Sequence, residues 1–305
     1  MRIVLIGQAT FGESVLKALL ERREEVVAVY VPPDIPGSKP DSLKHSAEQL
    51  GIAVFQPKRM RDPDVYYNYV KLAPDLGVMA FVTDIVPLPI LQCPRLGTIQ
   101  YHPSLLPKHR GGTAINWPII NGETKTGITV FWPDAGIDTG PVLLQREAEI
   151  SPDDTVGSLY YHKLFPLGVK ALMDAIELIY KGKAPRIPQD ESQATYEGLC
   201  REKDAIIDWG QAVAKVYNLI RGANPQPGAT THLHSEELKV FDCEMIVQDV
   251  AAVPGEVIES SERGWAIASQ GGYLLIKRVQ PRGSLKVSAP DFARSVGLKR
   301  GERLG

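Results

Sequence analysis

The sequence has little cysteine and no long apolar run. Its three cysteines, Cys93, Cys200 and Cys243, are odd in number, far apart and without C-x-x-C spacing, so we expect neither disulfides nor a metal cofactor. No segment approaches the roughly 18 apolar residues of a membrane-spanning helix. The chain begins with an apolar strand and shows no signal peptide. A cytoplasmic location without membrane contact is therefore the expectation.

The chain also lacks a strong charge of either sign. It carries 34 basic and 36 acidic side chains, a formal net charge of −2, which gives no general attraction to nucleic acid. Gly7 and Gly12 follow the first apolar run without the G-x-G-x-x-G spacing of a dinucleotide site, so a nicotinamide enzyme is disfavoured. With 44% hydrophobic and 23% charged residues, the composition is that of an ordinary globular protein.

The first half alternates between continuous apolar runs and helical patterns. Such alternation predicts an α/β fold with a doubly wound, Rossmann-like parallel sheet that helices cover on both faces. The expected strands are residues 3–6, 26–31, 52–55, 76–81 and 97–101, with helices near residues 11–20, 43–50 and 65–72 between them.

Further elements complete this domain and lead into a second one. Residues 127–132 and 142–150 read as paired strands, a short helix precedes them at 113–120, and one long amphipathic helix follows at 158–180. Short apolar runs separated by turn signals after residue 220 predict a small OB-like β-barrel. We expect a catalytic domain at 1–181, a surface linker at 182–203 and the barrel domain at 204–305.

The most informative residues lie between 100 and 145. His102 follows the expected strand 97–101, and the loop Asp134-Ala-Gly-Ile-Asp138-Thr-Gly140 comes later. A histidine exchanges a proton near neutral pH, and a carboxylate orients it and stabilises its cation. In open α/β sheets, ligands bind at the carboxyl ends of the strands, where His102 would lie. A lone histidine would be read as structural, but the pair predicts acyl-group chemistry.

Several motifs in order resemble the formyltransferase family that uses 10-formyltetrahydrofolate. They are His102-Pro-Ser-Leu-Leu-Pro107, His109-Arg110-Gly111, Ala114-Ile115-Asn116-Trp117 and the loop 134–140. Segments such as Asn224-Pro-Gln-Pro-Gly-Ala229 and Ala289-Pro-Asp-Phe-Ala-Arg294 resemble the C-terminal barrel of methionyl-tRNA formyltransferases. Around the active site, Tyr101, Lys108 and the Ala114 motif are more similar to the hydrolase domain of 10-formyltetrahydrofolate dehydrogenase.

The resemblance implies a catalytic asparagine two residues before the histidine, then the histidine and the second loop aspartate. Here His102 and Asp138 match, but Gln100 occupies the asparagine position. Gln100 keeps an amide donor, one methylene further out than in asparagine. The resemblance to the hydrolase domain of the dehydrogenase implies an apolar residue at this position instead. The residues implied to contact the folate are Ser104, Leu105, Leu106 and Pro107, and the backbones of Asp84, Ile85, Val86 and Asp134; the Asp134 side chain reads as a turn former.

The acceptor of the formyl group stays open. We favour transfer to a small-molecule amine; the alternatives are hydrolysis to formate and tetrahydrofolate, transfer to methionyl-tRNA, and folate binding without catalysis. The loop at 34–43 has one lysine, Lys39, where the tRNA enzymes carry a basic insert, which counts against tRNA. His109, Arg110 and Asn116 are candidates either for contacting the acceptor or for shaping the loops.

Overall fold

A computed structural model describes residues 1–305, which divide into two compact units. Unit 1 comprises Met1–Ala114, Thr126–Ala148 and Tyr161–Tyr196, and unit 2 comprises Ile115–Lys125, Glu149–Tyr160 and Glu197–Gly305. The chain thus enters unit 2 twice before it stays there. No helix is long and apolar enough to cross a bilayer, and the three cysteines are free thiols.

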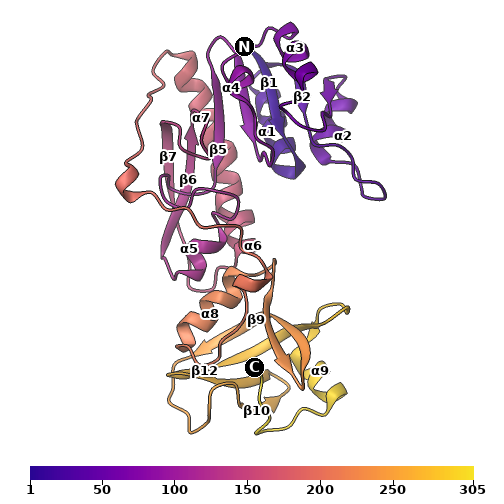
Figure 1. Ribbon diagram of the computed structural model, residues 1–305, viewed down its shortest axis with the longest axis vertical. Helices are drawn as coiled ribbons and strands as arrows, with labels where there is room; N and C mark the ends of the chain where they lie inside the picture. The colour runs from indigo at the N-terminus through magenta and orange to yellow at the C-terminus, as the bar shows by residue number, and fades with distance from the viewer. The chain divides into compact units, whose positions relative to one another are not determined.

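Unit 1 is built on a seven-stranded sheet in the order β3-β2-β1-β4-β5-β6-β7 (Figure 1). The strands from β3 to β5 pair in parallel, while β6 runs antiparallel to β5. The predicted Rossmann-like α/β fold is confirmed, with a mixed edge. The strands are β1 (Arg2–Gly7), β2 (Glu25–Tyr30), β3 (Ala53–Phe55), β4 (Leu76–Ala80), β5 (Thr98–His102), β6 (Lys125–Phe131) and β7 (Val142–Glu149).

The helices of unit 1 form where the apolar side chains recur at helical spacing. In α1 (Ala9–Glu21), the buried residues Phe11, Val15 and Leu19 lie four positions apart and share one face. The ring of Phe11 packs on Tyr101 of β5 with 4.4 Å between centroids. This contact ties the helix to the strand that carries the site. The others are α2 (Ser42–Gln49), α3 (Pro63–Lys71), α4 (Leu88–Leu91), which the sequence pattern did not reveal, and α7 (Phe165–Tyr180).

The single helix expected at 158–180 is wrong in one respect. The structure has α6 (Val156–Leu159), a five-residue π-helix (Tyr160–Leu164) and then α7. Pro166 lies in the first turn of α7 and has no backbone N–H to continue the preceding helical ladder. A change of hydrogen-bond register before α7 accommodates this missing donor.

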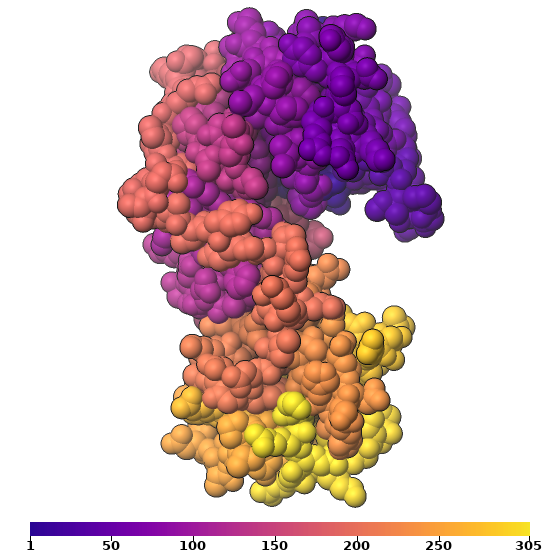
Figure 2. Space-filling view, in the orientation of Figure 1, coloured from indigo at the N-terminus to yellow at the C-terminus, as the bar shows by residue number.

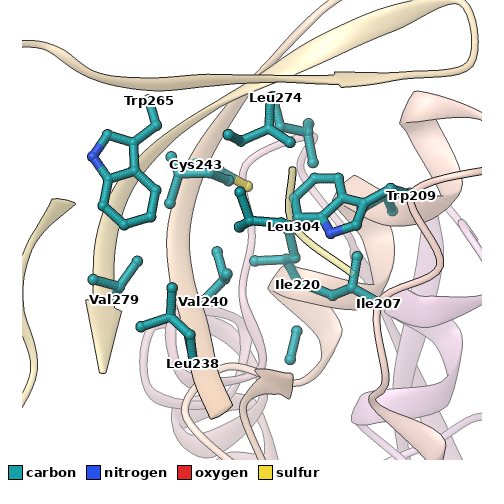
Figure 3. Close-up of a cluster of buried hydrophobic side chains, with 14 of the residues drawn as sticks. Ile207, Trp209, Ile220, Leu238, Val240, Cys243, Trp265, Leu274, Val279 and Leu304 are labelled. Carbon is teal, nitrogen blue, oxygen red and sulfur yellow. The ribbon is translucent and has the colours of Figure 1, made fainter. Parts of the chain in front are cut away.

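Unit 2 combines the β-rich C-terminal part of the chain with the segments Ile115–Lys125 and Glu149–Tyr160, which we expected in the first domain. Its antiparallel sheet has the order β10-β11-β12-β9-β8, with β13 beside β12. Trp265 is fully buried in its core, beside Cys243 and Val279 (Figure 3). The elements are α5 (Asn116–Ile120), α8 (Val213–Gly222), β8 (Ala229–Leu233), β9 (Glu236–Ile246), β10 (Val257–Ser261), β11 (Gly264–Ser269), β12 (Gly272–Pro281), β13 (Val287–Ser288) and α9 (Ala289–Val296).

Candidate functional site

Strand β5 carries two of the predicted site residues on one face. Side chains alternate along a strand, so Gln100 and His102 point to the same side and Tyr101 to the other. Tyr101 packs against Gly168 of α7, where an added Cβ would lie 2.4 Å from its ring. The tyrosine face is therefore closed by α7, and the opposite face presents Gln100 and His102 at the carboxyl end of the strand.

The imidazole of His102 is buried and faces a hydrogen-bond acceptor at each nitrogen. Its Nε2 lies 2.9 Å from the backbone carbonyl of His109, and its Nδ1 lies 3.5 Å from Oδ2 of Asp138. A neutral imidazole has one N–H and can serve one of these acceptors, whereas the cation donates to both. Each ring nitrogen of His102 thus has a hydrogen-bond acceptor nearby.

Asp138 is held in an uncommon backbone conformation. Its φ of 57° lies in the left-handed region, which residues other than glycine rarely occupy. The side chain is buried, and Oδ2 accepts a hydrogen bond of 2.8 Å from the N–H of Gly111. Backbone outliers of this kind persist where the surrounding contacts impose them, often at functional sites. The structure places this carboxylate beside the ring of His102.

The other loop aspartate has a different task. Oδ1 of Asp134 accepts hydrogen bonds from the N–H of Gly136 at 3.0 Å and from Oγ1 of Thr139 at 2.6 Å. These local bonds shape the turn that leads to Asp138. The interpretation of the Asp134 side chain as a turn former agrees with this geometry.

Thr129 of β6 holds the segment after His102 through two hydrogen bonds. Its Oγ1 donates to the carbonyl of Ser104 at 2.7 Å and accepts from the N–H of Leu106 at 3.1 Å. The hydroxyl of Ser104 is fully buried and donates to the carbonyl of Lys108 at 2.6 Å. Leu106 is also buried, and Leu106–Pro107 is a cis peptide. The Ser104 side chain therefore shapes the loop, and Leu105 and Pro107 are the more exposed members.

Asp84, Ile85 and Val86 follow β4, the neighbour of β5. The carboxylate of Asp84 accepts from the backbone N–H groups of Met60 at 2.7 Å and Ile85 at 2.9 Å. Val86 is buried, whereas the side chain of Ile85 is largely exposed. Both carboxylate oxygens of Asp84 have backbone partners, so this side chain organises the loop.

A cavity of about 210 Å³ opens at the carboxyl ends of β1, β2 and β4. Its walls are mostly apolar, with the cation Lys58 and the carboxylate of Asp84 among them. This is the edge of the sheet at which α/β proteins bind ligands. The apolar lining consists of Ile6, Tyr30, Val31, Pro32, Pro33, Pro57, Met60, Phe81 and Val82.

Residues that sequence reasoning left open have defined positions. Arg110 is buried and bonds Glu191 through two nitrogens, at 2.7 and 2.9 Å. The hydrogen bond from Arg110 lowers the pKa of the Glu191 carboxyl below its usual value. Asn116, in unit 2, donates to the carbonyls of Gly222 and Gln226. Arg110 and Asn116 therefore serve to hold loops and helices.

Sequence reasoning missed residues in the segment treated as a surface linker. Gln189 donates to backbone carbonyls of the Asp138 loop, and Oγ1 of Thr195 accepts from the N–H of His109 at 2.8 Å. No periodicity or motif marks Gln189, and Thr195 stands out only as part of Ala194-Thr195-Tyr196, a segment that resembles methionyl-tRNA formyltransferases; the partners of both residues are distant in sequence.

Comparisons with known proteins place this chain in a family. Residues 1–176 match the family model described as "Formyl transferase" and residues 200–297 the one described as "Formyl transferase, C-terminal domain". The chain is 40% identical over 309 residues to human cytosolic 10-formyltetrahydrofolate dehydrogenase, covering 96% of this chain and 34% of that protein. The chain thus spans about a third of the length of that relative.

A second relative matches from end to end. Methionyl-tRNA formyltransferase of Geotalea daltonii is 37% identical over 310 residues, covering 100% of this chain and 98% of that protein. Among solved structures, the sugar 3N-formyl transferase WlaRD has a TM-score of 0.69 at 19% identity, covering 93% of this chain and 99% of that one. Such distant structures share the fold. On the two family models and the full-length relative, the chain belongs to the formyl transferase family.

Proposed function

We propose that this protein transfers the formyl group of 10-formyltetrahydrofolate to the amine of a small molecule. The observation that supports this most directly is the buried pair of His102 and Asp138 at the carboxyl end of β5, with Gln100 on the same face of the strand. The pair joins a group that exchanges protons near neutral pH to a carboxylate that stabilises its cation.

The reaction has three requirements that these side chains meet. The amine nitrogen attacks the formyl carbon, the carbonyl oxygen becomes an oxyanion, and the amine proton must reach the departing folate nitrogen. Nε2 of His102 exchanges the carbonyl of His109 for the substrate, donates to the oxyanion and relays the proton, while Asp138 orients the ring through Nδ1 and stabilises its charge. Gln100 supplies a second donor through its amide. Loss of one such donor typically lowers the rate by roughly 100- to 1000-fold.

The proposed folate contacts flank this pair. Backbone groups of Asp84, Ile85 and Val86 receive the polar edge of the pterin, and the backbone of Asp134 completes that side. Ser104 to Pro107 provides an aliphatic wall, and Thr129 holds its conformation through hydrogen bonds to Ser104 and Leu106. Flat heterocycles are commonly bound by such apolar walls with a few aligned polar groups.

A small acceptor is favoured over tRNA by the charges of the loop after β2. The loop after β2 carries Lys39 together with Asp34 and Asp41, and Asp34 is already paired with Lys44. Transfer RNA requires several cations directed at phosphates, and this loop does not supply them.

Hydrolysis is the second candidate because of the likeness to 10-formyltetrahydrofolate dehydrogenase, at 40% identity. In that reaction, water takes the place of the amine and formate is released. The full-length likeness to a methionyl-tRNA formyltransferase keeps tRNA as a third acceptor. Folate binding without turnover is the fourth outcome.

One assay separates these four functions. Purified protein is incubated with 10-formyltetrahydrofolate alone, with a panel of small amines, and with charged initiator tRNA, while tetrahydrofolate, formate and formylated product are measured. Turnover that depends on a small amine supports the proposal. Release of formate without acceptor, product only with tRNA, or binding without turnover would each replace it with the corresponding alternative.

The same assay tests the catalytic pair. His102→Ala and Asp138→Ala are each expected to lose at least about 100-fold in rate. His234→Ala and Asp249→Ala are matched controls, since both residues lie in exposed positions of unit 2. Near-normal turnover by either site variant, with the fold intact by circular dichroism, would refute the assigned roles.

A further inference from the structure

The segment from Ile187 to Tyr196, here called the clamp segment, is hydrogen-bonded to the rest of unit 1 at both ends. Near its start, Ile187 and Val142 of β7 exchange two backbone hydrogen bonds of 2.8 and 2.9 Å. Near its end, the N–H of Thr195 donates to the carbonyl of Pro107. The carbonyl of Thr195 accepts a hydrogen bond of 3.0 Å from the backbone N–H of Arg110. The segment, salmon in Figure 2, lies at the surface.

Gln189 connects the two catalytic loops through one amide group. Its Nε2 donates to the carbonyls of Asp138 at 2.8 Å and Gly140 at 2.7 Å. Its Oε1 accepts from Nε of Arg110 at 3.2 Å and from Nη2 at 2.8 Å. Because the amide nitrogen only donates and the oxygen only accepts, these four bonds define its orientation. One side chain thus joins the loop after His102 to the loop of Asp138.

The partner of Gln189 is itself held in place. The guanidinium of Arg110 is buried and forms a two-pronged ion pair with Glu191 of the same clamp segment. The Glu191 hydrogen bond raises the pKa of Arg110, which stays a cation and a donor. Gln189 therefore bonds the buried, ion-paired Arg110 through its oxygen and the Asp138 loop through its nitrogen.

The consequence for the site follows from the backbone of Asp138. Its carbonyl is bound by Gln189, while its carboxylate lies beside Nδ1 of His102 and accepts from Gly111. The left-handed conformation of Asp138 needs such contacts to persist. We propose that Gln189 is a positioning residue, which sets the direction of the Asp138 carboxylate and through it the orientation of His102. This inference rests on the proposed function of that pair.

The test compares two replacements of Gln189 with a matched control. Gln189→Met keeps the length and removes all four hydrogen bonds, whereas Gln189→Glu keeps the acceptor for Arg110 and loses both donors to the Asp138 loop. Gln193→Met is the control, because Gln193 is exposed in the same segment and bonds only Asp190. A misplacement of reacting groups by about 1 Å can lower a rate by roughly 100-fold.

We expect both Gln189 variants to lose about 10- to 100-fold in kcat, with KM for 10-formyltetrahydrofolate changed less than about threefold. Amide hydrogen exchange of residues 134–140 should be faster in both variants and unchanged in Gln193→Met. An unchanged kcat in the Gln189 variants, or equal losses in Gln193→Met, would overturn the proposal. If the wild-type protein turned over no substrate, the proposed function would fail. The amide hydrogen-exchange comparison would then still test whether Gln189 holds the Asp138 loop in place.

Discussion

Oδ2 of Asp138 lies 3.5 Å from Nδ1 of His102 and at the same time accepts a hydrogen bond from Gly111. One oxygen therefore serves both the backbone of the histidine loop and the ring of the histidine. The second ring nitrogen is directed at the carbonyl of His109. Both ring nitrogens of the histidine thus face hydrogen-bond acceptors, in a buried position where charge interactions are stronger than in water.

Removing the charge of Asp138 while keeping its shape tests its electrostatic role. Asp138→Asn is expected to lower kcat by about 100-fold or more, because an amide does not stabilise the His102 cation. Thermal unfolding should show a folded protein with a melting temperature within a few degrees of the wild type. A variant that retained more than a tenth of the wild-type kcat would show that the carboxylate acts through its shape alone.

The amide of Gln100 is tested by removing or moving its donor. Gln100→Leu is expected to lower kcat by about 100-fold if the amide contributes to oxyanion stabilisation. Gln100→Asn keeps the donor and draws it back by one methylene, and should retain more activity than the leucine variant. Gln280→Leu, on β12 of unit 2, is the control. Equal turnover by Gln100→Leu and the wild type would remove Gln100 from the site.

Gly140 ends the Asp138 loop where a side chain has no room. A Cβ at this position would lie 1.8 Å from the carbonyl oxygen of Trp132, a backbone atom that cannot yield. Gly140→Ala is expected to destabilise the protein by at least about 2 kcal/mol, or about 4 °C in melting temperature. Gly198→Ala is the control, since no atom lies within 4 Å of its added Cβ. Equal melting temperatures for the two variants in a calorimetric scan would contradict this packing.

Burial makes the thiols of this protein weaker acids than exposed thiols. It raises the pKa of Cys200 to about 11, with Asp204 adding to the effect, and it also raises the pKa of Cys243. The thiolate is the reactive form. At pH 8.5, near the pKa of an exposed thiol, iodoacetamide should therefore alkylate the folded protein much more slowly than the guanidinium-unfolded chain. Equal rates in the two states would contradict the burial of these thiols.

The raised pKa of Cys200 makes the stability of the protein depend on pH. Between about pH 8.5 and about 11, the unfolded chain loses the Cys200 proton while the folded protein keeps it. The free energy of unfolding should therefore be highest, with respect to this group, below pH 8.5 and fall as the pH rises through that window. Urea titrations at pH 8 and 10 measure the fall, and Cys200→Ser should reduce it. An unchanged slope in the serine variant would assign the fall to other groups.

Local patterns in the chain were sufficient for most of the fold. Continuous apolar runs such as β4 predict buried parallel strands, and the spacing of Phe11, Val15 and Leu19 predicts the buried face of α1. The break between α6 and α7 was not predicted, because the apolar periodicity passes through Pro166 without interruption. Periodicity reports which face is buried and carries little information on hydrogen-bond register.

Motif order and residue chemistry in the sequence likewise pointed to His102 and Asp138, since strand ends and turn residues are local features of the chain. The role proposed for Gln189 rests only on the tertiary structure. Its bonds reach Asp138 and Arg110 across 51 and 79 positions, from a segment whose glycine, proline, serine and charged residues indicate only a surface linker. Hydrogen bonds between such distant positions depend on how the sheet brings the loops together, which no local pattern encodes.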